Sequence, residues 1–208
     1  MTNEIKALGV TVVALLALAA SAGTASAAPS FHLETAPATF TGESGTLELL
    51  TEEGTTSCKL TAFRGTTNGI VAASIELAPE YRECLMFGFI GATINPEECK
   101  YRLDLVEGSS PATAAVSVVC PSGQSIRETN PICTVTIGTQ TGLHHVVFTN
   151  NSSKTTRDLK ASVTVEGITY TASSGCSSPG TFNNATWRGE ITLRADNSSG
   201  AQQGLWVE

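Results

Sequence analysis

The sequence predicts an all-β protein, an antiparallel β-sandwich of the immunoglobulin-like or a similar kind that is stapled by disulfides. Apolar and polar residues alternate with a period of two in many short runs, which is typical of strands with one buried face. Turn residues separate these runs at short intervals. After residue 27, no stretch keeps the apolar spacing of an amphipathic helix over about three turns.

The candidate strands are rich in Val, Ile and Thr, which suit a half-buried pleated surface. The runs with period-two alternation are 71–77, 99–105, 116–120, 133–137, 159–165 and 187–193. Turn residues gather at 42–45, 53–54, 68–69, 95–96, 107–111, 130–131, 150–153 and 177–180. Because no crossover helices separate the strands, the pattern excludes a parallel α/β sheet and favours an antiparallel one.

The N-terminal residues, 1–27, have the features of a signal peptide. Lys6 precedes an apolar run, 7–20, which is shorter than the roughly 20 residues needed to span a bilayer. Ala25-Ser26-Ala27 fits a small-x-small cleavage site. The alternative, a retained membrane anchor, lacks a stop-transfer segment and a basic cytoplasmic flank. We therefore expect a secreted, extracellular protein with no membrane span after cleavage.

The rest of the chain is predicted to hold one β-sandwich domain at 28–195 and a flexible C-terminal tail at 196–208. The tail is small and polar, so Trp206 within it is expected to be loosely placed. A division of the first segment into two small sandwiches remains an alternative.

The charge of the chain argues against nucleic acid as a partner. The formal net charge is −7, and the Lys and Arg residues are scattered singly. Phosphate binding depends on clustered basic side chains, so we expect no nucleic-acid contact and interpret the charge as a source of solubility.

The six cysteines of the chain all follow residue 27, and an even number in an exported protein predicts disulfides. Six thiols allow 15 pairings. Our hypothesis pairs Cys84 with Cys99 and Cys120 with Cys133, because each interval can fold as a hairpin, and by elimination Cys58 with Cys176. No C-x-x-C or Cys-plus-His spacing is present, so no metal or other cofactor is expected.

No group of residues predicts a catalytic site. His144 and His145 are adjacent on a candidate strand, so they point to opposite faces and are expected on the surface and at the core edge. The carboxylates at 52–53, 80/83 and 97–98 are interpreted as solvated turn acids. Because no nucleophile elbow or phosphate-binding glycine loop occurs, no catalytic residue is nominated.

An apolar run, 85–90, follows Cys84 directly and has two interpretations. As a strand buried on both faces, it would hide at least one of Phe87 and Phe89, and this is the outcome we expect. As an exposed hydrophobic finger, it would form a binding loop made of Met86, Phe87 and Phe89.

Several segments resemble a known family. They read F-H-L-E-T-A-P, G-F-I-G-A-T-I-N-P-E-E-C-K-Y, V-V-C-P-S-G-Q-S-I, C-T-V-T-I-G-T-Q-T-G-L and V-E-G-I-T-Y-T. Together they are similar to a group of uncharacterised secreted β-rich proteins from high-GC Gram-positive bacteria. That group carries no assigned activity, so the resemblance implies an exported bacterial protein and supplies no site residues.

These observations predict a secreted extracellular or cell-envelope protein that acts as a non-enzymatic binding or structural module. The alternative is a secreted hydrolase of wall polymers or esters, which would need a cleft that joins a histidine to a buried acid. The sequence specifies neither the ligand nor the oligomeric state.

Overall fold

The computed structural model describes residues 28–108, 110–151 and 158–208, and these residues form strands, turns and loops. The predicted signal peptide, 1–27, lies outside the described residues. Within the described residues no helix has the length and apolar character needed to cross a membrane. The strands are β1 (Phe31–Leu33), β2 (Ala38–Thr51), β3 (Gly54–Thr67), β4 (Val71–Ala72), β5 (Ser74–Met86), β6 (Ile90–Asn95), β7 (Lys100–Glu107), β8 (Ala112–Val119), β9 (Ile126–Thr129), β10 (Thr134–Ile137), β11 (Gln140–Asn150), β12 (Leu159–Ala172), β13 (Gly180–Asn197), β14 (Gln202–Gln203) and β15 (Leu205–Val207).

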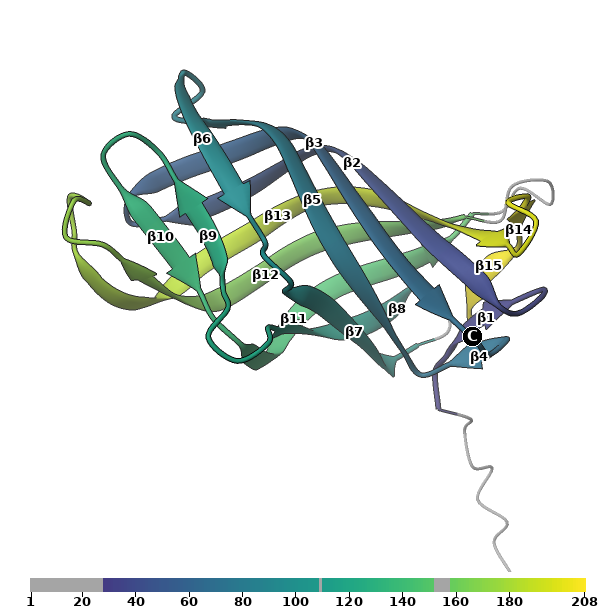
Figure 1. Cartoon of the computed structure of the whole chain (residues 1–208). Helices are drawn as coiled ribbons and strands as arrows, with labels where there is room; N and C mark the ends of the chain where they lie inside the picture. The colour runs from purple at the N-terminus through teal and green to yellow at the C-terminus, as the bar shows by residue number, and fades with distance from the viewer. Residues whose placement is uncertain (1–27, 109, 152–157) are drawn as a thin grey trace, which may run out of the picture.

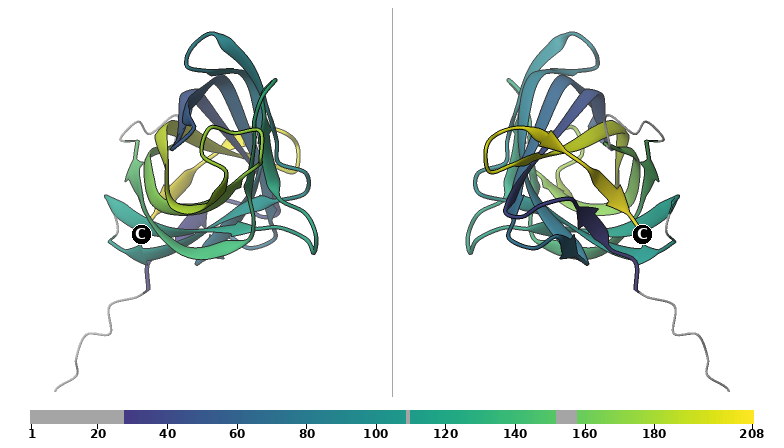
Figure 2. Two further views of the ribbon diagram at one scale, coloured as in Figure 1. Left: turned by 90° about the vertical axis from the view of Figure 1, so that its left-hand side faces the viewer. Right: turned by 90° about the vertical axis from the view of Figure 1, so that its right-hand side faces the viewer.

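The long strands form one antiparallel sheet that closes on itself as an eight-stranded barrel (Figures 1 and 2). The strands β2, β3, β5, β7, β8, β11, β12 and β13 each pair with the next, and β13 pairs back with β2. Toward one end of the barrel, β6, β9 and β10 replace β7, β8 and β11 between β5 and β12. The ring is therefore closed along its whole length.

The prediction of an all-β antiparallel fold is confirmed, but the barrel replaces the expected sandwich. Period-two alternation shows that each strand buries one face. Two facing sheets and one closed sheet satisfy that requirement equally well, because both give every strand an inner and an outer face.

The hydrophobic core fills the barrel. Phe40, Phe63 and Val116 are buried inside it, whereas polar and charged side chains cover the outer faces of the same strands. The predicted turn at 42–45 lies instead within β2. A Cβ at Gly42 would stand 3.1 Å from the Phe63 Cβ, so this glycine permits close packing in the core and does not mark a turn.

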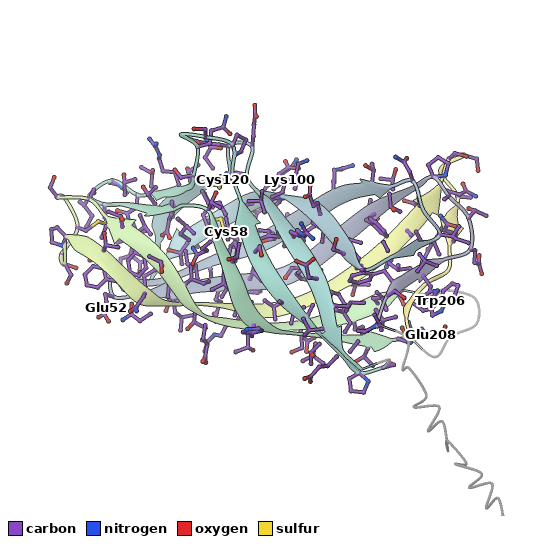
Figure 3. The ribbon with its side chains drawn as sticks, turned by 90° about the horizontal axis from the view of Figure 1, so that it is seen from below. Glu52, Cys58, Lys100, Cys120, Trp206 and Glu208 are labelled. Carbon is purple, nitrogen blue, oxygen red and sulfur yellow. A yellow bond between two sulfur atoms is a disulfide. The ribbon has the colours of Figure 1, made fainter. Side chains whose placement is uncertain are left out.

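A small three-stranded sheet, β15-β1-β4, covers one end of the barrel, which we call the capped end. Phe31 of β1 and Leu205 and Val207 of β15 are buried there. Residues 196–208 are therefore not the flexible tail that the polar sequence predicts, since their apolar side chains complete the core. Trp206 lies opposite His32 in the register of this sheet, and their rings stack with centroids 5.5 Å apart. Figure 3 shows Trp206 and Glu208 at the end of the barrel remote from Glu52.

The disulfides pair Cys58 with Cys84, Cys99 with Cys120 and Cys133 with Cys176, so our pairing hypothesis is wrong. One bridge joins the strands β3 and β5, one joins the residues next to the ends of β7 and β8, and one ties the start of β10 to the β12–β13 loop. Cys58 and Cys84, for example, face each other directly in the β3–β5 register, with Cα atoms 3.9 Å apart. The hypothesis fails because the hairpin after Cys84 turns too early to close on Cys99: Cys84 faces Ala92 across β5–β6 and faces Cys58 across β3–β5.

Candidate functional site

The turns that follow β2, β5, β9 and β12 gather at the end of the barrel opposite the capped end (Figure 1). We call this the loop end. It holds the apolar run at 85–90, which lies at the turn between β5 and β6.

Phe87 and Phe89 are exposed at this turn, with 53% and 77% of their surface accessible, while Met86 is buried. Our expectation that at least one of the two rings is buried is therefore wrong. Phe87 and Gly88 both have positive φ angles, 53° and 78°, so the chain reverses there and does not continue as a strand. We refer to Phe87 and Phe89 together as the aromatic tip.

The backbone of Phe87 is strained. Its φ places a bulky side chain in the left-handed region, which glycine and asparagine usually occupy in tight hairpin turns. Such residues cost on the order of 1–3 kcal/mol and concentrate at functional sites. A small polar residue could form the same turn with less strain, yet the turn carries a large apolar ring.

The β2–β3 turn packs against the aromatic tip and fixes its position. A Cβ at Gly54 would lie 2.2 Å from Cε1 of Phe87, so the ring rests where this glycine has no side chain. The Phe87 amide donates a hydrogen bond of 2.9 Å to the Thr55 carbonyl. The rings of Phe87 and Phe89 lie 6.5 Å apart between centroids with planes inclined by 31°. The tip is therefore an ordered surface.

A third exposed apolar residue of the loop end, Ile132, is 69% accessible on the β9–β10 turn. Asn130 shapes this turn, because its Oδ1 accepts hydrogen bonds from the amides of Ile132 and Cys133. The Asn130 Nδ2 group lies 3.1 Å from the Met86 sulfur and donates to it, which ties this turn to the base of the aromatic tip.

The β12–β13 loop is held by a disulfide and by a buried carboxylate. Cys176 is bonded to Cys133, and Glu53 accepts hydrogen bonds from the Ser177 amide, the Ser177 hydroxyl and the Ser178 amide. Burial acts to raise the pKa of Glu53, but these hydrogen bonds outweigh it and leave the pKa lowered. Glu53 is thus a buried structural anion, in contrast to the solvated turn acid that the sequence predicts.

Glu53 lies close to the sulfur atoms of Cys133 and Cys176, within 4.8 Å. The two sulfurs form a disulfide and offer no thiolate, so this group does not provide the ligands of a metal site.

The second buried acid of the loop end is Glu128 on β9, which sequence reasoning missed. It accepts a hydrogen bond from the Thr56 hydroxyl, its one side-chain hydrogen bond among the described residues. Burial raises the pKa of Glu128, and the hydrogen bond from Thr56 opposes that rise only in part. The sequence feature that could have identified Glu128 as buried is its position two residues after Ile126. This spacing places both side chains on the inward face of the strand.

The barrel interior contains a cavity of about 50 Å³, which is too small for a ligand of ordinary size. Its lining is apolar and includes Phe63, Tyr101 and Trp187. An apolar cavity that holds benzene measures about 150 Å³, so this space is a packing defect of the core. Near it, the hydroxyls of Tyr81 and Tyr101 lie 2.7 Å apart, and burial raises the pKa of both phenols well above the usual value.

The remaining predicted site residues do not assemble with these groups. His144 is exposed on β11, and the side chain of His145 lies outside the described part of the structure. Glu80 forms an exposed ion pair with Arg82, and Glu97 accepts a hydrogen bond of 2.9 Å from the Ser125 amide. Among the side chains that the structure describes, no histidine lies beside the buried acids of the loop end.

No protein-family model, curated protein or solved structure matches this chain.

Proposed function

We propose that the protein is an exported, non-enzymatic binding module that contacts its partner through the aromatic tip. The observation that carries the proposal is the exposure of Phe87 and Phe89 on a strained turn that its neighbours hold in place. Complete burial of a phenylalanine side chain gains about 1.5–3 kcal/mol. Transfer of both exposed rings from water to an apolar partner therefore provides about 2–4 kcal/mol of binding free energy.

Export to an extracellular or cell-envelope location belongs to the same proposal. The predicted signal peptide at 1–27 supports it, and the three disulfides are compatible with an oxidising compartment. The resemblance to secreted proteins of Gram-positive bacteria favours a bacterial cell envelope as the setting.

The hydrolase alternative rests on Glu128, because a buried carboxyl with a raised pKa is the kind of group that serves as a general acid. Its side-chain partner among the described residues is a threonine hydroxyl, and inverting and retaining glycosidases need a second carboxylate. The geometry therefore supports binding better than hydrolysis.

The proposed function is tested by adsorption of the purified mature protein to octyl-coated beads. We expect the native protein to be retained and the Phe87→Ser/Phe89→Ser variant to pass through, because the variant loses the exposed rings. The matched control is Leu60→Ser/Ile70→Ser, which removes two side chains of similar exposure, 52% and 54%, outside the loop end. Equal retention of all three proteins would contradict the proposal.

A further inference from the structure

We infer that the partner of the aromatic tip is a lipid layer, into whose hydrocarbon the rings of Phe87 and Phe89 insert. This inference rests on the proposed function and specifies the chemistry of its partner. It is carried by the shape, the area and the charge of the loop end.

The aromatic tip is convex. The β5–β6 hairpin rises above the rest of the ribbon in Figures 1 and 2, while the β12–β13 turn reaches furthest out at the left of Figure 1. Phe89 is the more exposed of the two rings, at 77%, while one side of the Phe87 ring lies against Gly54 of the β2–β3 turn, so a fluid layer can cover the outer faces of both rings without a matching groove.

The apolar area of the tip is too small for a stable protein partner. A phenylalanine buries about 150–250 Å² at most, so two of them supply on the order of 300–500 Å². A specific protein interface buries about 800 Å² on each partner. The pair of rings alone falls below that requirement, whereas insertion into lipid needs no minimum matched surface.

The loop end is almost free of charge, although Asp, Glu, Lys and Arg make up 15% of the chain. Its turns lie at 51–54, 86–90, 129–134 and 172–180. The cysteines in these turns are disulfide-bonded, so the titratable side chains there are Glu52 and Glu53. Glu53 is buried and hydrogen-bonded. Outside its strands, the capped end carries the acids Glu34, Asp158 and Glu208 among the described residues, whereas the further acid of the loop end, Glu128, is buried on β9.

This distribution favours the loop end for contact with lipid, because approach to hydrocarbon strips water from charged groups at a large cost. The turns of the loop end offer no Lys or Arg to anionic headgroups, and the net charge of −7 repels an anionic surface. The expected target is therefore an electrically neutral lipid layer, and the binding should depend little on salt.

The test is co-sedimentation of the mature protein with vesicles of phosphatidylcholine. We expect a fraction of the native protein to sediment with the vesicles, a fraction that rises with lipid concentration and is equal at low and high salt. The partition coefficient of Phe87→Ser/Phe89→Ser should be lower by about 30-fold or more, the factor that corresponds to loss of about 2 kcal/mol. The Leu60→Ser/Ile70→Ser control should bind as the native protein does.

A Phe89→Trp variant gives a second readout that does not depend on the double variant. Its fluorescence emission should shift to shorter wavelength when these vesicles are added, because the indole leaves water. Trp187 and Trp206 lie in the barrel wall and at the capped end, so the native protein serves as the spectral background.

The bead and vesicle experiments separate binding through the aromatic tip from binding to lipid. Retention on octyl beads through the tip without any vesicle binding would overturn the lipid inference and leave the binding function in place. Vesicle binding that survives in Phe87→Ser/Phe89→Ser would also overturn it. A native dimer that this variant converts to a monomer, measured by sedimentation velocity, would replace the lipid layer by a second copy of the chain.

Discussion

At the scale of single residues, the two buried carboxyl groups of the loop end have opposite titration behaviour. Glu53 is held as an anion by hydrogen bonds from Ser177 and Ser178, so its pKa is lowered. Glu128 has a single hydroxyl donor, Thr56, and the burial that raises its pKa dominates. The number of donors that reach the carboxylate therefore decides which charge state the fold favours.

Glu128 should make the folded state less stable as the pH rises. Because its pKa is higher when folded than its ordinary value of 4.5, the folded state binds the proton more tightly, and this contribution is lost as the pH rises through the folded pKa. The free energy of unfolding of Glu128→Gln, measured with denaturant at several pH values, should not show this decrease. Relative to the variant, the native protein should lose up to about 1.4 kcal/mol per pH unit between pH 4.5 and the folded pKa of Glu128, and nothing further above that pKa. A difference that is constant from acid to neutral pH would refute this.

The same measurement on Glu53→Gln should give the opposite sign. The pKa of Glu53 is lowered by its hydrogen bonds, so its stabilising contribution is present above its unfolded pKa and is lost as the pH falls through the folded pKa. The native protein should exceed this variant in unfolding free energy near neutral pH by about 1.5–3 kcal/mol, as expected for hydrogen bonds to a charged group. An equal stability of the two proteins at neutral pH would contradict the role assigned to Glu53.

At the scale of elements, the disulfides reinforce strand pairs that the barrel already makes. Cys99 and Cys120 lie one residue outside the paired ends of β7 and β8, where Lys100 faces Val119. Cys133 directly precedes β10, whereas Cys176 lies in the β12–β13 loop, beyond the end of β12 at Ala172. The bridges therefore secure the barrel wall and the β12–β13 loop.

Peptide mapping of the unreduced protein should recover Cys58–Cys84, Cys99–Cys120 and Cys133–Cys176. Removal of the last bridge by Cys133→Ser/Cys176→Ser should lower the unfolding free energy by about 4 kcal/mol on the chain-entropy account, since the bridge spans 43 residues. A recovered peptide that joins Cys84 to Cys99 would contradict this arrangement of the strands.

At the scale of the whole molecule, the two ends of the barrel are built differently. At the capped end, side chains of β1 and β15 complete the core. The ring of Phe31 in β1 makes an edge-to-face contact with Phe148 of β11, with centroids 5.3 Å apart. The turns around the aromatic tip at the loop end instead carry few charges, of which Glu52 is exposed and Glu53 is buried. The barrel therefore has one end that completes the core and one end, with the aromatic tip, that we propose as the contact with lipid.

The cap should contribute directly to global stability. Leu205→Ala should lower the unfolding free energy by about 2–5 kcal/mol, because it removes a fully buried side chain from the core. Gln202→Ala, at an exposed position of the same segment, is the control and should stay within about 0.5 kcal/mol of the native protein. Equal and small effects of the two changes would mean that the C-terminal strands are not part of the cooperative fold.

The sequence by itself determined the all-β class, the antiparallel order and most of the turns. Period-two alternation records which face of a strand is buried, and this local property is visible at Tyr101, Leu103 and Leu105 without any knowledge of their neighbours.

Only the tertiary structure decided the closure of the barrel, the cysteine pairs and the exposure of the aromatic tip. Closure and disulfides depend on which strands lie side by side, and alternation is the same for every choice of neighbour. The run around Phe87 is apolar throughout, so its pattern fits a buried strand. What exposes it is the pair of positive φ angles at Phe87 and Gly88, which reverse the chain while Met86 fills the last core position of β5.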